Sequence, residues 1–91
     1  MRPSTLTRSL KRKRKEIDLI DQKLLTLLNQ RLRTALKIGR IKREMGKKIY
    51  DPQREKEVLK RLGQKNRGPL KEKDMKKIFR LIMKIYRGYQ L

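Results

Sequence analysis

The chain contains no cysteine, no histidine and no tryptophan. Without cysteine it can form no disulfide and offers no thiol nucleophile, and without histidine it cannot build a Ser-His-Asp triad. The usual zinc sites also depend on these two residue types, so we expect no metal site. A single Phe and three Tyr are the only aromatic residues, which leaves no stacking platform for nucleic-acid bases.

Long apolar runs are also missing, so we expect no segment that spans a membrane. Residues 1–13 are basic and free of Asp and Glu, and they lack the apolar stretch of a secretory signal. We expect a cytoplasmic protein; a transit peptide, or a nuclear-type basic cluster at residues 11–15, is the alternative for this segment. Residues 1–13 should form either a basic tail or the start of the first helix, and residues 14–91 should form one helical domain.

The charge is strongly one-sided, with 29 Lys and Arg against 9 Asp and Glu and a formal net charge of +20. Such a balance attracts nucleic acids, acidic membrane surfaces and small anionic substrates alike. One interpretation is therefore a basic helical nucleic-acid-binding protein. The absence of a recognition-helix turn and of zinc-finger spacing speaks against it, and a small anionic substrate is the competing interpretation.

The apolar spacing predicts an all-α chain of three helices without strands. The first helix should begin between Thr7 and Arg14 and end near residue 45, with Gly46 as its C-terminal cap. The second should follow the N-cap Asp51 and end at Gly63, and the third should run from about residue 70 or 72 to 89. At ~1.5 Å per residue the first helix spans roughly 50 Å, more than a small globule needs, so a second copy should cover its apolar face.

One face of the first helix carries a stripe at alternating steps of three and four residues. Its members are Arg14, Ile17, Asp21, Leu24, Leu28, Arg31, Ala35, Ile38 and Lys42. Because an unpaired buried charge costs several kcal/mol, the three cations of the stripe either extend to solvent or meet the negative charge of a ligand. Gly39, inside the same helix, suggests a close approach by another backbone or a ligand.

The start of the second helix reads Asp51-Pro52-Gln53-Arg54-Glu55. Glu55 is favoured in a first helical turn by the helix dipole, whereas Arg54 is not. Arg54 is therefore either an exposed surface residue or a functional one.

Taken together, the order Arg14, Arg31, Lys42 and then Asp51-Pro-x-Arg-Glu55 resembles the all-helical class of chorismate mutase over residues 14–90. The segments around residues 41–52 and 68–69 are most similar to mutase domains associated with 3-deoxy-7-phosphoheptulonate synthase. The resemblance therefore also implies a partner enzyme of the shikimate pathway.

The resemblance implies an intertwined homodimer in which the two long first helices pair antiparallel. Its substrate would be the chorismate dianion, bound at two equivalent sites. Arg14, supplied by the other chain, and Arg31 would clamp the two substrate carboxylates, while Lys42 would reach a carboxylate and the ether oxygen. Arg12 is an alternative for the cross-chain role, but Arg14 fits the stripe.

The same resemblance assigns roles to residues of the second and third helices. Glu55, helped by the backbone near Asp51, would hold the ring hydroxyl, and Arg54 would line the pocket. Gln90 would be the second donor to the ether oxygen. Tyr86, one turn earlier, stands where relatives place a small or hydroxyl residue that contacts a carboxylate.

The chemistry that this implies, chorismate to prephenate, is an intramolecular [3,3] rearrangement that needs no nucleophile, metal or cofactor. The site would act by orienting the substrate and by stabilising negative charge on the ether oxygen. An isochorismate pyruvate-lyase or a non-catalytic regulatory relative with the same fold remains an alternative.

Overall fold

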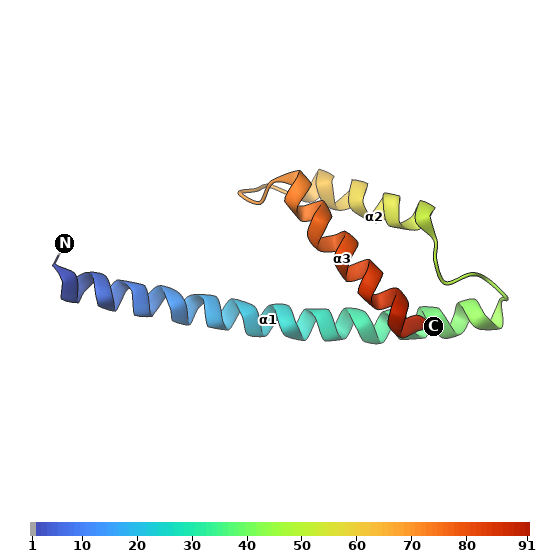
Figure 1. Cartoon of the computed structure of the whole chain (residues 1–91), viewed down its shortest axis with the longest axis horizontal. Helices are drawn as coiled ribbons and strands as arrows, with labels where there is room; N and C mark the ends of the chain where they lie inside the picture. Colours follow the sequence, from blue (N-terminus) through green and yellow to red (C-terminus); the bar gives the residue numbers. More distant parts are fainter. Residues whose placement is uncertain (1) are drawn as a thin grey trace. The chain divides into compact units, whose positions relative to one another are not determined.

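The computed structural model describes residues 2–91 and contains three α-helices (Figure 1). They are α1 (Pro3–Glu44), α2 (Pro52–Lys65) and α3 (Glu72–Gln90). No strand occurs in this range, so the predicted all-α class with a very long first helix is confirmed. Over the same residues, none of the helices has both the length and the apolar character needed to cross a bilayer.

The chain divides into two compact units, one ending at Arg33 and the other covering residues 34–91, and α1 contributes to both. The first unit consists of α1 alone, and no side chain among residues 4–33 is buried. α1 begins at Pro3, earlier than the expected range, because the fixed φ of proline suits a first helical turn and the Leu6 N–H donates to the Arg2 carbonyl at 3.0 Å.

The C-terminal end of α1 is closed by Gly46, as predicted. Gly46 has a φ of +68°, its N–H donates to the Arg43 carbonyl at 3.1 Å, and the Lys47 N–H donates to the Lys42 carbonyl at 2.8 Å. This pair of bonds is the Schellman motif, which a glycine in the left-handed region accommodates without strain.

The sequence predicts the start of α2 correctly but not its end. Asp51 is the N-cap as expected, since its Oδ1 accepts the Arg54 N–H at 3.0 Å. The predicted end at Gly63 is wrong, because α2 continues to Lys65. Gly63 does not adopt the positive φ of a glycine cap, and the C-cap is Asn66, whose N–H donates to the Leu62 carbonyl.

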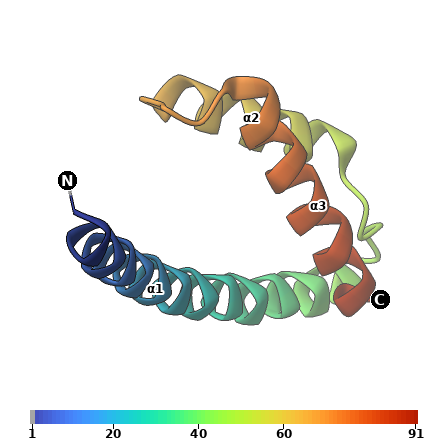
Figure 2. The ribbon, with the colours of Figure 1, turned by 60° about the vertical axis from the view of Figure 1, so that its left-hand side comes forward.

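The core lies in the unit formed by residues 34–91. α3 starts beside the end of α2 and runs across to the C-terminal part of α1, as both views show (Figures 1 and 2). The buried apolar residues are Ala35, Leu59, Met75, Met83 and Tyr86.

The apolar side chains of α3 are covered to different degrees. Met75, Met83 and Tyr86 are buried, whereas Ile78 and Ile85 remain 47% and 49% exposed. One apolar side of the helix is therefore in the core, and another is only partly covered by the described chain.

The carboxyl end of α3 packs directly on α1 at Gly39. A Cβ on Gly39 would lie 3.2 Å from the Gln90 Cβ. Two hydrogen bonds hold this contact: Gln90 Nε2 donates to the Ala35 carbonyl at 2.8 Å, and Arg43 Nη1 donates to the Gln90 carbonyl at 2.7 Å. The close approach expected at Gly39 is therefore made by the end of α3.

We predict that Gly39→Leu destabilises the fold by about 1–3 kcal/mol, because the new side chain would displace Gln90 from α1. Gly88→Leu is the matched control, since no atom lies within 4 Å of a Cβ at Gly88 and loss of a helical glycine is worth roughly 0.5–1 kcal/mol in the stabilising direction. Urea unfolding at one fixed protein concentration measures both. Equal unfolding midpoints for the two variants would contradict the role given to Gly39.

Candidate active site

The predicted site residues fall into two groups along the chain. Arg14 and Arg31 belong to the unit that ends at Arg33. The other predicted residues belong to the unit of residues 34–91 and are Lys42, Asp51, Arg54, Glu55, Tyr86 and Gln90.

Lys42 lies in the last turn of α1 and is half-buried. Its Nζ donates to the Ile49 carbonyl at 2.9 Å, which ties the connector between α1 and α2 to the amine. An ammonium group carries three N–H donors, so two remain available to a ligand. Lys42 is therefore a held cation with spare hydrogen-bonding capacity.

Gln90 lies next to the turn of α1 that carries Lys42. Its Cβ approaches Gly39, and positions three apart on a helix share one face, so Gly39 and Lys42 are neighbours on α1. The Gln90 amide uses one N–H on the Ala35 carbonyl and keeps a second. Lys42 and Gln90 are therefore each held by one hydrogen bond and each keep at least one further N–H donor. That both donors act on the same substrate atom stays a prediction.

Glu55, in the first turn of α2, forms an ion pair between its Oε2 and Arg87 Nη1 of α3. The two side chains are 23% and 28% exposed. Arg87 also lies over the ring of Tyr50, with its Cζ 4.3 Å from the ring centroid. Sequence reasoning missed Arg87, although its position three residues before Gln90 places the two side by side on α3.

Asp51 and Arg54 are occupied locally. The Asp51 carboxylate caps α2 through the Arg54 N–H. The Arg54 guanidinium lies 3.7 Å from Glu57, and both side chains are about half exposed, at 54% and 52%. Exposed pairs of this kind contribute little to stability, so the contacts of Arg54 match those of a surface arginine, and its place in a pocket stays a prediction.

Tyr86 is only 7% exposed and packs in the core of the C-terminal unit. Its ring therefore belongs to the helix packing. The contact of its hydroxyl with a substrate carboxylate stays a prediction.

Arg14 and Arg31 do not lie on a buried face within a single chain. Arg14 is exposed and Arg31 is half-buried, while the apolar stripe members Ile17 and Leu24 are 56% and 51% exposed. Coverage of this part of α1 by a second copy, and the counter-charge for Arg14, stay predictions.

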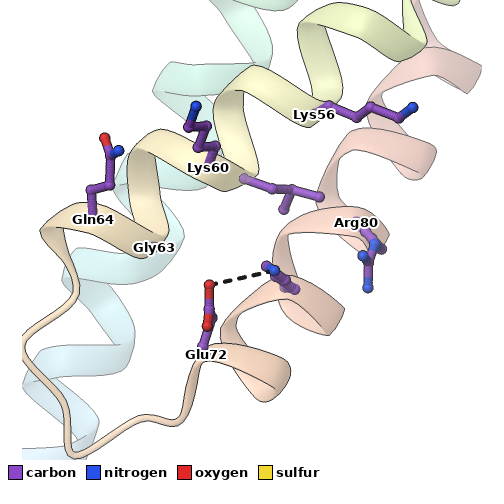
Figure 3. A pocket seen from close by; sticks show the side chains of 8 residues that line it. Lys56, Lys60, Gly63, Gln64, Glu72 and Arg80 are labelled. Atoms are coloured by element: carbon purple, nitrogen blue, oxygen red, sulfur yellow. Dashed lines mark ion pairs between the residues drawn. The ribbon is translucent and has the colours of Figure 1, made fainter.

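A separate hollow of about 390 Å³ lies between α2 and α3 (Figure 3). Its lining includes the cations Lys56, Lys60, Lys76 and Arg80. Glu72 pairs with Lys76 at 3.4 Å, and Leu59 is the buried apolar residue of this lining. None of the predicted site residues contributes to this lining, so the hollow is distinct from the candidate site.

Lys42 and Gln90 keep N–H donors and Glu55 keeps a carboxylate oxygen, each held by a neighbouring group, and held groups of these kinds suit the orientation of a small polar anion. Residues 13–91 match the family model of chorismate mutase type II. Because this match covers most of the chain, the protein belongs to the chorismate mutase type II family.

Known proteins with similar sequences and structures agree. A chorismate mutase structure from Thermus thermophilus is 35% identical, with a TM-score of 0.89, covering 90% of this chain and 93% of that one. A Helicobacter pylori chorismate mutase in complex with prephenate is 42% identical, with a TM-score of 0.83, covering 89% and 88%.

A bifunctional chorismate mutase/prephenate dehydratase of Pseudomonas aeruginosa is 40% identical over 79 residues, which is 81% of this chain. The chain spans only 22% of that relative's length, about a fifth. The finer similarity to synthase-associated mutase domains stays a prediction.

Proposed function

We propose that this protein is a chorismate mutase that rearranges chorismate to prephenate. The observation that carries the proposal is that Lys42 and Gln90, in a chain of this family, are each held by a hydrogen bond to a backbone carbonyl and keep spare N–H donors. The bound prephenate in the Helicobacter pylori relative supports the substrate class. A cytoplasmic location and a partner enzyme of the shikimate pathway stay predictions.

The reaction breaks the ether C–O bond of chorismate and forms a new C–C bond within the same dianion. No group on the protein needs to accept a proton or form a covalent bond. The site must hold the substrate in a compact, chair-like shape, which is catalysis by orientation. As the C–O bond breaks, negative charge grows on the ether oxygen, and Lys42 and Gln90 would donate hydrogen bonds to it. Because neighbouring contacts hold both donors in place, little reorganisation is needed when that charge develops.

The remaining roles follow from the charges of the substrate. Glu55 would accept a hydrogen bond from the ring hydroxyl, with help from the backbone at Asp51. Arg31, together with an Arg14 from a second chain, would bind the two carboxylates as guanidinium–carboxylate pairs. Arg54 and Tyr86 would line the same pocket.

A second copy of this chain would complete the site. Residues 4–33 of α1 have no buried side chain. Several large apolar residues in this range are more than half exposed, namely Leu6, Leu10, Ile17, Leu19, Ile20, Leu24, Leu25 and Leu27. A helix owes most of its stability to packing of its apolar face. An antiparallel copy would cover this face and carry its own Arg14 toward the partner's site.

The first test of this function is turnover of chorismate by the purified protein. Loss of chorismate absorbance with formation of prephenate is expected. Lys42→Met should lower kcat by about 10²–10³, the cost of one lost donor to a developing oxyanion. Lys37→Met, at an exposed lysine of the same helix, is the control and should keep wild-type rates. Pyruvate release from isochorismate without chorismate turnover would point to a lyase instead, and salt-sensitive nucleic-acid binding without either activity would favour the basic-binder alternative.

The dimer predicts a particular mass in solution. Sedimentation equilibrium at low micromolar concentration should give about twice the 11.1 kDa mass of the chain, because a monomer would expose the apolar face of α1. A compact folded monomer at these concentrations would rule out the shared site.

The cross-chain role of Arg14 predicts complementation. Arg14→Ala and Arg31→Ala proteins should each be nearly inactive. Refolded together in equal amounts, they should form heterodimers in which one site is intact and the other lacks both arginines. Random mixing would restore about a quarter of wild-type activity, because about half of the dimers are mixed and each has one working site. Absence of recovery despite demonstrated subunit exchange would place Arg14 outside the site of the other chain.

A further inference from the structure

Glu55 is held from a different helix. Its carboxylate pairs with Arg87 through a single oxygen, Oε2, and Arg87 in turn lies over the Tyr50 ring. The three residues come from separate elements: Tyr50 from the connector after α1, Glu55 from the first turn of α2, and Arg87 from the last turn of α3. The cluster therefore fixes one side chain against two other parts of the C-terminal unit.

The environment of this pair differs from that of the other ion pairs in the described chain. The Glu55 and Arg87 side chains are 23% and 28% exposed, whereas Arg54 and Glu57 are 54% and 52% exposed. Lower exposure means less screening by water and salt, so the Arg87 contact restricts the carboxylate more than a surface contact would. The aromatic ring under the guanidinium restricts Arg87 itself.

The geometry leaves part of the carboxylate available. A carboxylate has two oxygens and about four acceptor positions, and the bond to Arg87 uses Oε2. Glu55 Oε1 can therefore accept a hydrogen bond from another donor while the pair stays intact. A charge-assisted bond of this kind fixes the rotamer before the ligand arrives, which lowers the entropy lost on binding.

We propose that Arg87 is a positioning residue that holds the Glu55 carboxylate in the orientation in which Oε1 accepts a hydrogen bond from the substrate. This inference rests on the proposed mutase function, in which Glu55 binds the ring hydroxyl. Arg87 does not contact the substrate; it acts only through Glu55. Tyr50 acts one step further away, by supporting the guanidinium.

This arrangement predicts non-additive kinetics. Arg87→Met should lower kcat/KM by roughly tenfold, a size typical of coupling between residues in direct contact. If the loss caused by Arg87→Met lies in kcat, the loss caused by Glu55→Gln should lie in kcat too, and the same holds for KM. In the Glu55→Gln background, Arg87→Met should cost less than about twofold. Arg87→Lys, which keeps the charge but loses the planar fork, should recover part of the loss.

The controls distinguish a role of Arg87 in orienting Glu55 from a role that only stabilises the fold. Arg80→Met, at an exposed arginine of the same helix, should leave kcat/KM unchanged. NMR of ¹³C-labelled glutamate gives a readout without turnover: the Glu55 side-chain carboxyl resonance, assigned by its loss in Glu55→Gln, should shift in Arg87→Met and not in Arg80→Met.

Additive losses in the double variant would overturn the proposal, because they would mean that Arg87 acts on the substrate directly. A lower melting temperature with unchanged kcat/KM would overturn it as well, because Arg87 would then only stabilise the fold. Failure of the underlying function is distinguishable from both outcomes, since the wild-type protein would then not turn over chorismate at all.

Discussion

The close approach of α3 to α1 at Gly39 is the contact on which the C-terminal unit depends. A Cβ at position 39 would lie 3.2 Å from the Gln90 Cβ, so a large side chain there would push the end of α3 away from α1. The approach brings the Gln90 amide to the Ala35 carbonyl and the Arg43 guanidinium to the Gln90 carbonyl. A carbonyl has two lone pairs, so Ala35 can accept this bond in addition to its helical one. The same contact orders the last turn of α3, and that turn also carries Arg87.

The sequence predicts those features of the fold that depend on local chemistry. Gly46 and Asp51 act within one turn of their own helices, so their residue types and positions were sufficient to predict both caps. Gly63 shows the limit of such reasoning. A glycine near the end of a helical pattern suggests a cap, but here the backbone stays helical past Gly63 and the helix is capped at Asn66.

The same distinction explains which site residues the sequence could find. Lys42, Glu55 and Gln90 are recognised because their order along the chain resembles that of a known family. Arg87 has no such motif; its partner Glu55 is 32 residues away in the sequence and becomes its neighbour only when α2 and α3 pack. The α1 stripe shows the same limit, since spacing indicates which residues share a face, while the structure of one chain buries Ala35 and leaves Ile17 and Leu24 more than half exposed.

The overall positive charge and the few polar side chains that are fixed by hydrogen bonds have different effects on ligand binding. A net charge of +20 creates an electric field that attracts anions of many kinds and raises their local concentration. Exposed cations, such as those that line the hollow between α2 and α3, do not fix the orientation of a bound anion. Selectivity for one reaction requires donors that cannot turn toward water. Lys42 is tied to the Ile49 carbonyl, Gln90 to Ala35, and Glu55 to Arg87. Each keeps free hydrogen-bonding capacity, so in the proposed mutase site these three contacts, and not the large positive charge, would set the orientation of the substrate.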